Sequence, residues 1–89
     1  MTHERALMDD LIRKIDSAAR AEGADRVVAV TVRLGPLSHF THEHFRQHFE
    51  WAAADTIADG AGVRFEDWAP VEGADDTAVM LTDVEISTV

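Results

Sequence analysis

The sequence predicts an α+β fold of two layers, in which two helices pack on one face of a three-stranded mixed sheet. Apolar residues recur at intervals of three and four in two segments, which is typical of amphipathic helices. In three other segments apolar and polar residues alternate, which is typical of half-buried strands. The order along the chain is helix, strand, helix, strand, strand, and these elements suffice to enclose one core between two layers.

The first helix is expected over residues 4–22. Its apolar positions run from Leu7 to Ala19 with helical spacing, and Gly23 follows as a C-terminal stop. Acidic residues lie toward its start and basic residues toward its end, an order that the helix dipole favours. The segment therefore has an apolar face that can be buried and residues at both ends that are typical of helix termini.

The second helix is expected over residues 41–57. Thr41 is a suitable N-cap because its hydroxyl can accept a hydrogen bond from a backbone N–H of the first turn, and Glu43 suits that turn electrostatically. Phe45 and Phe49 lie four residues apart and begin a stripe that should face the sheet. The stripe continues through alanines and ends before a glycine-rich turn.

The clearest strand is expected over residues 26–34, where β-branched residues alternate with others. One of its faces is apolar throughout: Val28, Val30, Val32 and Leu34. We expect this face to pack against the helices. The opposite face becomes polar toward Arg33.

Two further strands are expected over residues 63–66 and 77–89. The alternation of the last strand changes parity near Thr82 and Asp83, which predicts a β-bulge there. These strands should form a hairpin through residues 71–76, because six residues are too few for a parallel crossover. On the sheet face away from the helices we expect Arg33, Arg64, Glu66 and Trp68. A large ring on an open sheet face points to a partner or to a homo-oligomer.

Composition and charge narrow the classes of function. The 89 residues fit a single domain spanning 1–89, and the absence of cysteine excludes disulfides, thiolate zinc sites and thiol nucleophiles within it. The net charge of −9 argues against nucleic acid and anionic membrane surfaces as partners. No segment has the pattern of a membrane span or a signal peptide, so we expect a cytoplasmic protein. Neither a phosphate-binding loop nor a catalytic triad is recognisable, so we do not expect an enzyme.

The first four residues have the composition of a metal chelate. Met1, Thr2, His3 and Glu4 supply an α-amine, backbone amides, an imidazole and a carboxylate. Nitrogen-rich donor sets of this kind favour Cu(II) and Ni(II) over Mg(II) and Ca(II). With Met1 present, the amine, two deprotonated amides and the imidazole of His3 can close a square plane; without it, one position stays open. The alternative is a solvated helix start, in which Glu4 only complements the dipole.

Histidines also gather around the start of the second helix. His44 and His48 are four residues apart on one helical face and form an alternative candidate metal pair. A third ligand would have to come from His39 or Glu43, neither of which lies in line with the pair. The other interpretation is a solvated or half-buried face beside the phenylalanine stripe.

Five segments of the chain occur in a specific order: His3-Glu4 before the first helix, and residues 32–38, 45–50, 53–61 and 81–86. Together they resemble the HypA family of hydrogenase nickel-insertion proteins over most of the chain. The resemblance implies a metallochaperone that delivers Ni(II), with a HypB-type GTPase, to the large subunit of [NiFe]-hydrogenase, and in some organisms to urease. It also implies a nickel site at an N-terminal Met-His-Glu, whose His and Glu correspond to His3 and Glu4.

The chain departs from the family pattern in two places. Thr2 is inserted before His3, so the α-amine lies one residue further from the imidazole. The family also carries a zinc domain, built on two pairs of cysteines, between its last two strands; here residues 71–76 take that place. We therefore expect a nickel-binding metallochaperone-like domain without structural zinc. The alternative is a protein-interaction or accessory module on the same fold that has lost metal transfer.

Overall fold

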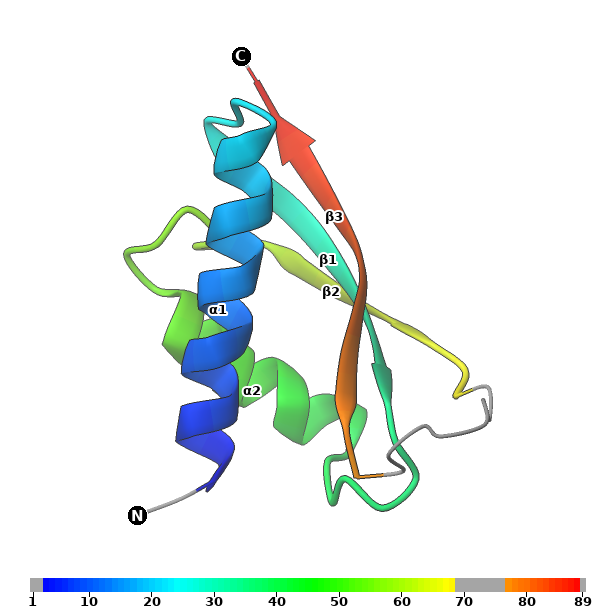
Figure 1. Ribbon diagram of the computed structural model, residues 1–89. Helices are drawn as coiled ribbons and strands as arrows, with labels where there is room; N and C mark the ends of the chain where they lie inside the picture. Colours follow the sequence, from blue (N-terminus) through cyan, green and yellow to red (C-terminus); the bar gives the residue numbers. More distant parts are fainter. Residues whose placement is uncertain (1–2, 69–76, 89) are drawn as a thin grey trace.

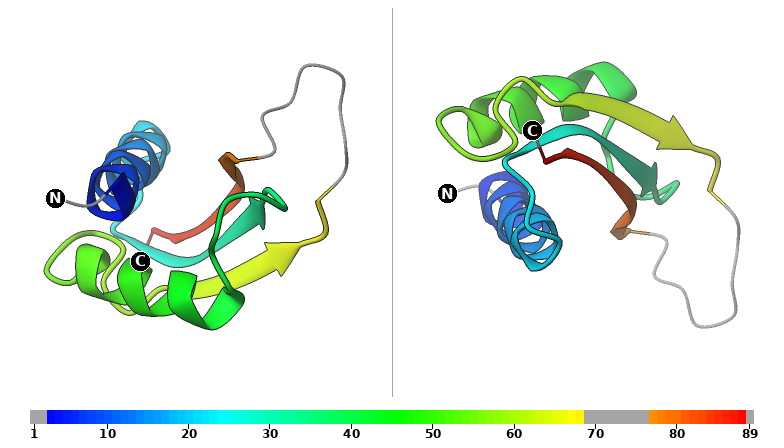
Figure 2. Two further views of the ribbon diagram at one scale, coloured as in Figure 1. Left: turned by 90° about the horizontal axis from the view of Figure 1, so that it is seen from below. Right: turned by 90° about the horizontal axis from the view of Figure 1, so that it is seen from above.

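The computed structural model describes residues 3–68 and 77–88, with side chains from Arg5 onward (Figure 1). It contains α1 (His3–Ala21), β1 (Arg26–Leu34), α2 (His42–Ala53), β2 (Gly62–Glu66) and β3 (Val79–Ser87). This is the predicted order of elements. Both helices lie against one face of the sheet and enclose one core, so the two-layer α+β fold is confirmed (Figure 2). Within the described residues, neither helix has an apolar run long enough to cross a membrane.

The sheet has the strand order β2-β1-β3, with β1 in the centre. β1 runs parallel to β2 and antiparallel to β3, so the predicted mixed sheet is confirmed. The predicted hairpin between the last two strands is wrong, because β2 and β3 lie on opposite edges and do not pair.

The length of the connection explains why that hairpin was not required. The predicted loop at 71–76 lies outside the described residues, but twelve residues, 67–78, separate β2 from β3. Neighbouring strands are about 4.8 Å apart, so such a segment easily spans the width of one intervening strand. β1 takes the central position because it is the most apolar of the three strands, and a central strand is shielded along both edges.

An irregularity in the pairing of β1 with β3 confirms the predicted bulge. Thr31 pairs with Asp83, whereas Val32 pairs with Leu81. Thr82 is therefore the extra residue on β3. The bulge restores the inward orientation of apolar residues on both sides of it.

A second irregularity changes the inner face of β1. Val27 pairs with Ile86 and Ala29 pairs with Glu85, which leaves Val28 without an opposite residue. Val27 is 1% exposed and Val28 is 37% exposed, so the predicted inward position of Val28 is wrong. The strict alternation failed here because one extra residue in a strand reverses the parity of its faces.

The core contains the predicted inner stripes of both helices. Its largest fully buried side chains are Met8, Ile15, Val27, Val30, Val32, Phe45 and Phe49. The rings of Phe45 and Phe49 stack with centres 6.3 Å apart, and Phe45 meets Phe65 of β2 edge to face at 5.7 Å. Aromatic contacts at these separations add to the free energy of burying apolar area. Two buried rings thereby fix the rotation of α2 about its own axis.

α2 begins as predicted and ends earlier than predicted. Thr41 is its N-cap, and the hydroxyl accepts a hydrogen bond of 3.0 Å from the backbone N–H of His44. The helix ends at Ala53, so the predicted helical segment 54–57 is wrong. The hydroxyl of Thr56 donates to the carbonyl oxygen of Ala53 at 2.6 Å, a side-chain bond that competes with continuation of the helix.

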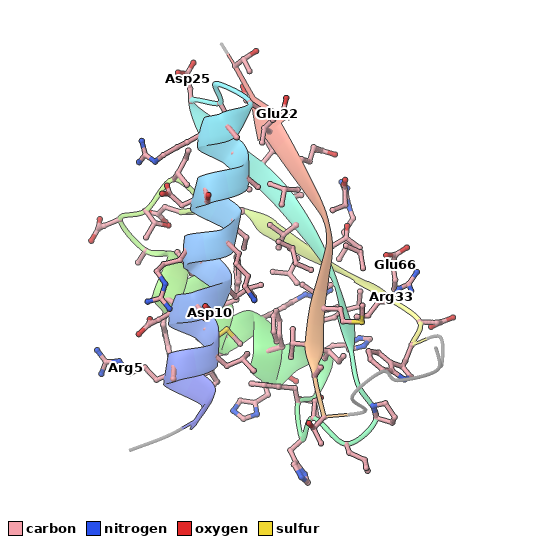
Figure 3. All side chains as sticks on the ribbon, viewed as in Figure 1. Arg5, Asp10, Glu22, Asp25, Arg33 and Glu66 are labelled. Carbon is pink, nitrogen blue, oxygen red and sulfur yellow. The ribbon has the colours of Figure 1, made fainter. Side chains whose placement is uncertain are left out.

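The sheet face away from the helices carries charged pairs, as predicted. Arg64 and Glu85 approach to 3.3 Å. Arg33 and Glu66 lie side by side at 3.6 Å (Figure 3). Trp68, just beyond the end of β2, is partly exposed. Exposed ion pairs contribute little to stability, so the main effect of these residues is to keep the open face polar.

Candidate metal site

The predicted chelate lies at the start of α1. The helix begins at His3, which places His3 and Glu4 in its first turn. Met1, Thr2 and the side chains of His3 and Glu4 lie outside the part of the chain that the structure describes. The chelate, its donor set and its geometry therefore stay a prediction, and the structure shows that His3 and Glu4 belong to the first turn of α1.

A cavity of about 500 Å³ opens between the N-terminal half of α1 and the C-terminal half of α2. It is lined by Arg5, Met8, Asp9, His48, Trp51 and Ala52. Arg5 lies near the N-terminal end of α1 (Figure 3). Because Arg5 lines the cavity, the cavity reaches the end of the helix that carries the predicted chelate. Neither Arg5 nor Asp9 was expected at a site, because the residues of α1 that face α2 depend on how the two helices cross.

The structure brings together two of the four histidines around the start of α2. His44 and His48 have ring centres 4.5 Å apart, as their spacing in the sequence predicted. His42 instead stacks on Phe65 with ring centres 3.9 Å apart, and His39 is exposed in the segment between β1 and α2, with a φ of 65°. Among the described residues, no three His, Cys, Asp or Glu side chains are grouped so as to hold a metal ion. Within the part of the chain that the structure describes, two imidazoles are thus brought together.

Aromatic rings flank this histidine pair. Phe40 lies 5.5 Å from His44 and 6.5 Å from His48, measured between ring centres. Trp51 lies 5.3 Å from His48 and is 65% exposed. Both histidines are half-buried, whereas Trp51 forms the outer rim of the cavity. Aromatic rings thus border the pair, and His48 lines the cavity.

The two adjacent carboxylates of α1 have different surroundings. Asp10 pairs with Lys14 at 3.0 Å and with Arg13 at 3.2 Å. The hydrogen bond from Lys14, together with one from Arg13, holds the pKa of Asp10 below its usual value. Asp9 instead lines the cavity together with His48. Asp9, and not Asp10, is therefore the carboxylate that adds negative charge to the cavity.

Comparison with known proteins finds relatives of one kind. Residues 1–73 match the family model described as hydrogenase/urease nickel incorporation, metallochaperone, HypA. The hydrogenase maturation factor HypA of Thermococcus gammatolerans is 42% identical over 65 residues, which cover 73% of this chain and 47% of that protein. The hydrogenase maturation factor HypA of Chlorobium limicola is 35% identical over 69 residues, which cover 78% of this chain and 60% of that protein. The chain spans about half the length of the curated relatives it matches.

Solved structures share the fold. The solution structure of the Ni metallochaperone HypA from Helicobacter pylori matches with a TM-score of 0.78 at 14% identity, covering 99% of this chain and 100% of that one. A second solution structure of a HypA protein matches with a TM-score of 0.74 at 16% identity, covering 98% of each chain. At these identities the likeness establishes the arrangement of helices and strands.

Proposed function

Because the chain belongs to the HypA family, we propose that it binds Ni(II) and assists the maturation of a nickel enzyme, [NiFe]-hydrogenase or urease. The observation that carries this proposal is the family match, which runs through residues 1–73 and so includes His3 and Glu4. The relatives that match over most of this chain are named hydrogenase maturation factors. His3 is the proposed essential ligand, and the α-amine and backbone amides supply the other nitrogen donors.

The start of a helix suits this donor set. The first four N–H groups of an α-helix have no intrahelical acceptor, so deprotonation of the amides of Thr2 and His3 breaks no helical hydrogen bond. The two charges of Ni(II) are cancelled by two deprotonated amides, so the complex adds no net charge at the positive end of the helix dipole. Glu4 stands next to His3 as an oxygen donor or as a hydrogen-bond partner of the bound ligands.

Whether Met1 is present determines how many coordination positions of the nickel ion the chain fills. With Met1, the amine, two amides and the imidazole supply four nitrogen donors, which is the planar arrangement that Ni(II) favours. Without Met1, the amine of Thr2, the amide of His3 and its imidazole supply three, and one position stays open. The open form exchanges its metal more readily, and exchange is what delivery to a client enzyme requires.

The chain contains no cysteine, so we infer that residues 71–76 replace the family's zinc domain and that 1–89 is a single nickel-binding domain. By resemblance, the proposed partners are a HypB-type GTPase and the large subunit of the nickel enzyme, in the cytoplasm. The net charge of −9 disfavours nucleic acid as a partner. The proposed role involves holding and transferring a metal ion and requires no catalytic residue.

The test is a nickel titration of untagged protein, followed by the d–d absorbance of planar Ni(II). The native chain should bind a single Ni(II) in this form, with an affinity that rises with pH because the amine and amides must lose protons. His3→Ala should abolish the planar signal, and Glu4→Ala should weaken or reshape it less. His44→Ala is the matched control, because it removes an imidazole from α2 and leaves the terminus intact. A planar signal that survives His3→Ala and disappears in His44→Ala would show that the N-terminal assignment is wrong.

A second candidate function is a protein-interaction module that has lost metal transfer. Trp51 favours it, because an indole that is 65% exposed beside a cavity is typical of an interface anchor. The same titration separates the two functions. A native chain that binds no nickel at micromolar concentration would select the interaction module.

A further inference from the structure

We propose that His44 and His48 of α2 form a second binding site for a divalent transition metal ion, with ligands other than those of the N-terminal chelate. The site goes beyond the proposed function and does not depend on it, because neither histidine belongs to the N-terminal donor set. Three features carry the proposal: the separation of the two imidazoles, the rigidity of the helix that holds them, and the surfaces around them.

The two imidazoles are already as far apart as chelation requires. Their ring centres lie 4.5 Å apart, and their planes make an angle of 69°. A metal–nitrogen bond is about 2.1 Å and the ring centre lies about 1.1 Å beyond the nitrogen, so each centre is about 3.2 Å from a bound ion. Two imidazoles on adjacent positions of a square-planar or octahedral ion then have centres about 4.5 Å apart. The spacing of the two rings on α2 therefore already fits chelation of one ion.

α2 holds the pair in place. Both histidines lie inside the 12-residue helix, where residues four apart share one face. Phe45 and Phe49, their immediate neighbours, are 0% and 1% exposed, so α2 cannot rotate without removing these rings from the core. Thr41 caps the first turn through the N–H of His44. The pair is therefore preorganised, and little chain ordering opposes metal binding.

The surroundings favour an open, exchangeable site. Phe40 and Trp51 border the pair, and the cavity of about 500 Å³ beside His48 has room for water as further ligands. Asp9 brings a carboxylate to this cavity and Arg5 a guanidinium, while the net charge of −9 attracts cations to the protein as a whole. Structural zinc sites use four protein ligands, whereas the proposed pair supplies two, so we expect weaker binding and faster exchange at the pair.

The donor chemistry sets the class of metal. Imidazole suits Cu(II), Ni(II) and Zn(II), whereas Mg(II) and Ca(II) prefer oxygen donors. Affinity for nitrogen donors rises from Ni(II) to Cu(II). Cu(II) is therefore the most sensitive probe of the pair, and Ni(II) is the ion that relates it to this family.

Trp51 provides a direct readout. Its ring centre lies 5.3 Å from that of His48, so Cu(II) or Ni(II) bound there quenches its fluorescence. The chain has two tryptophans, and Trp68→Phe leaves Trp51 as the only emitter. His3→Ala in the same chain removes the proposed N-terminal site. In this double variant, Cu(II) and Ni(II) should quench Trp51 saturably, and Mg(II) should not.

Variants of the pair should then separate this site from adventitious binding. His44→Ala and His48→Ala should each raise the apparent dissociation constant at least about tenfold, because the second imidazole binds at high effective concentration once the first is bound. His42→Ala is the matched control, since His42 lies on the same helix but stacks on Phe65. Quenching that survives both His44→Ala and His48→Ala, or that His42→Ala weakens equally, overturns the proposal.

A measurement on a chain that keeps both His44 and His48 gives a result that misfolding of the two variants cannot explain. In the His3→Ala chain, substoichiometric Cu(II) should broaden the ring resonances of His44 and His48 before those of His39 and His42. Broadening of the latter two first would refute the site. If the native chain shows no planar nickel signal while Trp51 is still quenched in the double variant, the N-terminal function is rejected and this site stands. A planar signal in the native chain without quenching in the double variant would reject this site and leave the N-terminal function standing.

Discussion

Removing the buried ring of Phe45 should destabilise the protein far more than removing the exposed ring of Trp51. Both aromatic residues belong to α2, but Phe45 is 0% exposed and Trp51 is 65% exposed. Phe45 also meets the rings of Phe40 and Phe65 edge to face, at 5.5 and 5.7 Å. The two substitutions therefore differ in burial and not in chemical type.

The expected magnitude follows from that burial. Replacing a core Phe by Ala costs about 3–5 kcal/mol, from the lost transfer free energy and from the cavity left behind. A domain of 89 residues has an unfolding free energy on the order of 5–13 kcal/mol. Phe45→Ala should thus remove about a quarter of the stability or more. Trp51→Ala should change it by less than about 1 kcal/mol, because most of the indole is already in water.

Urea unfolding followed by circular dichroism measures both effects. Small domains have slopes of about 1–3 kcal/mol per molar urea, so Phe45→Ala should lower the midpoint by about 1 M or more. At the same slope, Trp51→Ala should shift the midpoint by less than about a third of that amount. Equal shifts for the two variants, or a larger shift for Trp51→Ala, would refute the assignment of inner and outer faces to α2.

Three further predictions concern single interactions. Thr41→Ala should lower the unfolding free energy by about 1 kcal/mol because the N–H of His44 loses its acceptor, and Thr41→Ser should be nearly neutral; equal losses in urea unfolding would argue against the cap. The pKa of Asp10 is lowered by Lys14 and Arg13, so its contribution to stability is present above the unfolded-state pKa and is lost as pH falls through the lower folded-state pKa. In Lys14→Met, a carboxyl titration by NMR should move that pKa back up, and an unchanged titration would contradict the ion pair. Because the chain has no cysteine, a strong chelator should leave circular dichroism and melting temperature unchanged, and a large loss of structure would indicate a histidine-based structural metal site.

Local patterns in the sequence predicted which elements form, because helix stripes, caps and strand alternation depend on neighbouring residues. The N-cap at Thr41 and the bulge at Thr82 were both predicted in this way. The order of strands was not, because it depends on which strand gains most from the centre of the sheet. The inward position predicted for Val28 failed for a related reason, since its parity is set by pairing with a strand far away in the chain.

For the candidate metal sites, too, the sequence predicted the features that depend on nearby residues and missed those that depend on tertiary placement. The donors of the N-terminal chelate follow one another in the chain, so the sequence alone suffices to propose it. A spacing of four residues likewise predicted the approach of His44 and His48. The presence of Arg5 and Asp9 on the cavity beside His48 could not be predicted, because it requires the relative placement of α1 and α2.

The central claim is that Ni(II) binds at the chain terminus through His3 and deprotonated backbone amides. Calorimetric titration with Ni(II) in buffers of different ionisation enthalpy counts the protons released on binding. We expect about two to three protons to be released per Ni(II), from the amides and the amine, and this signal to be lost in His3→Ala and in a chain whose α-amine is acetylated. Release of about one proton or fewer by the native chain, or equally tight nickel binding by the acetylated chain, would contradict this claim.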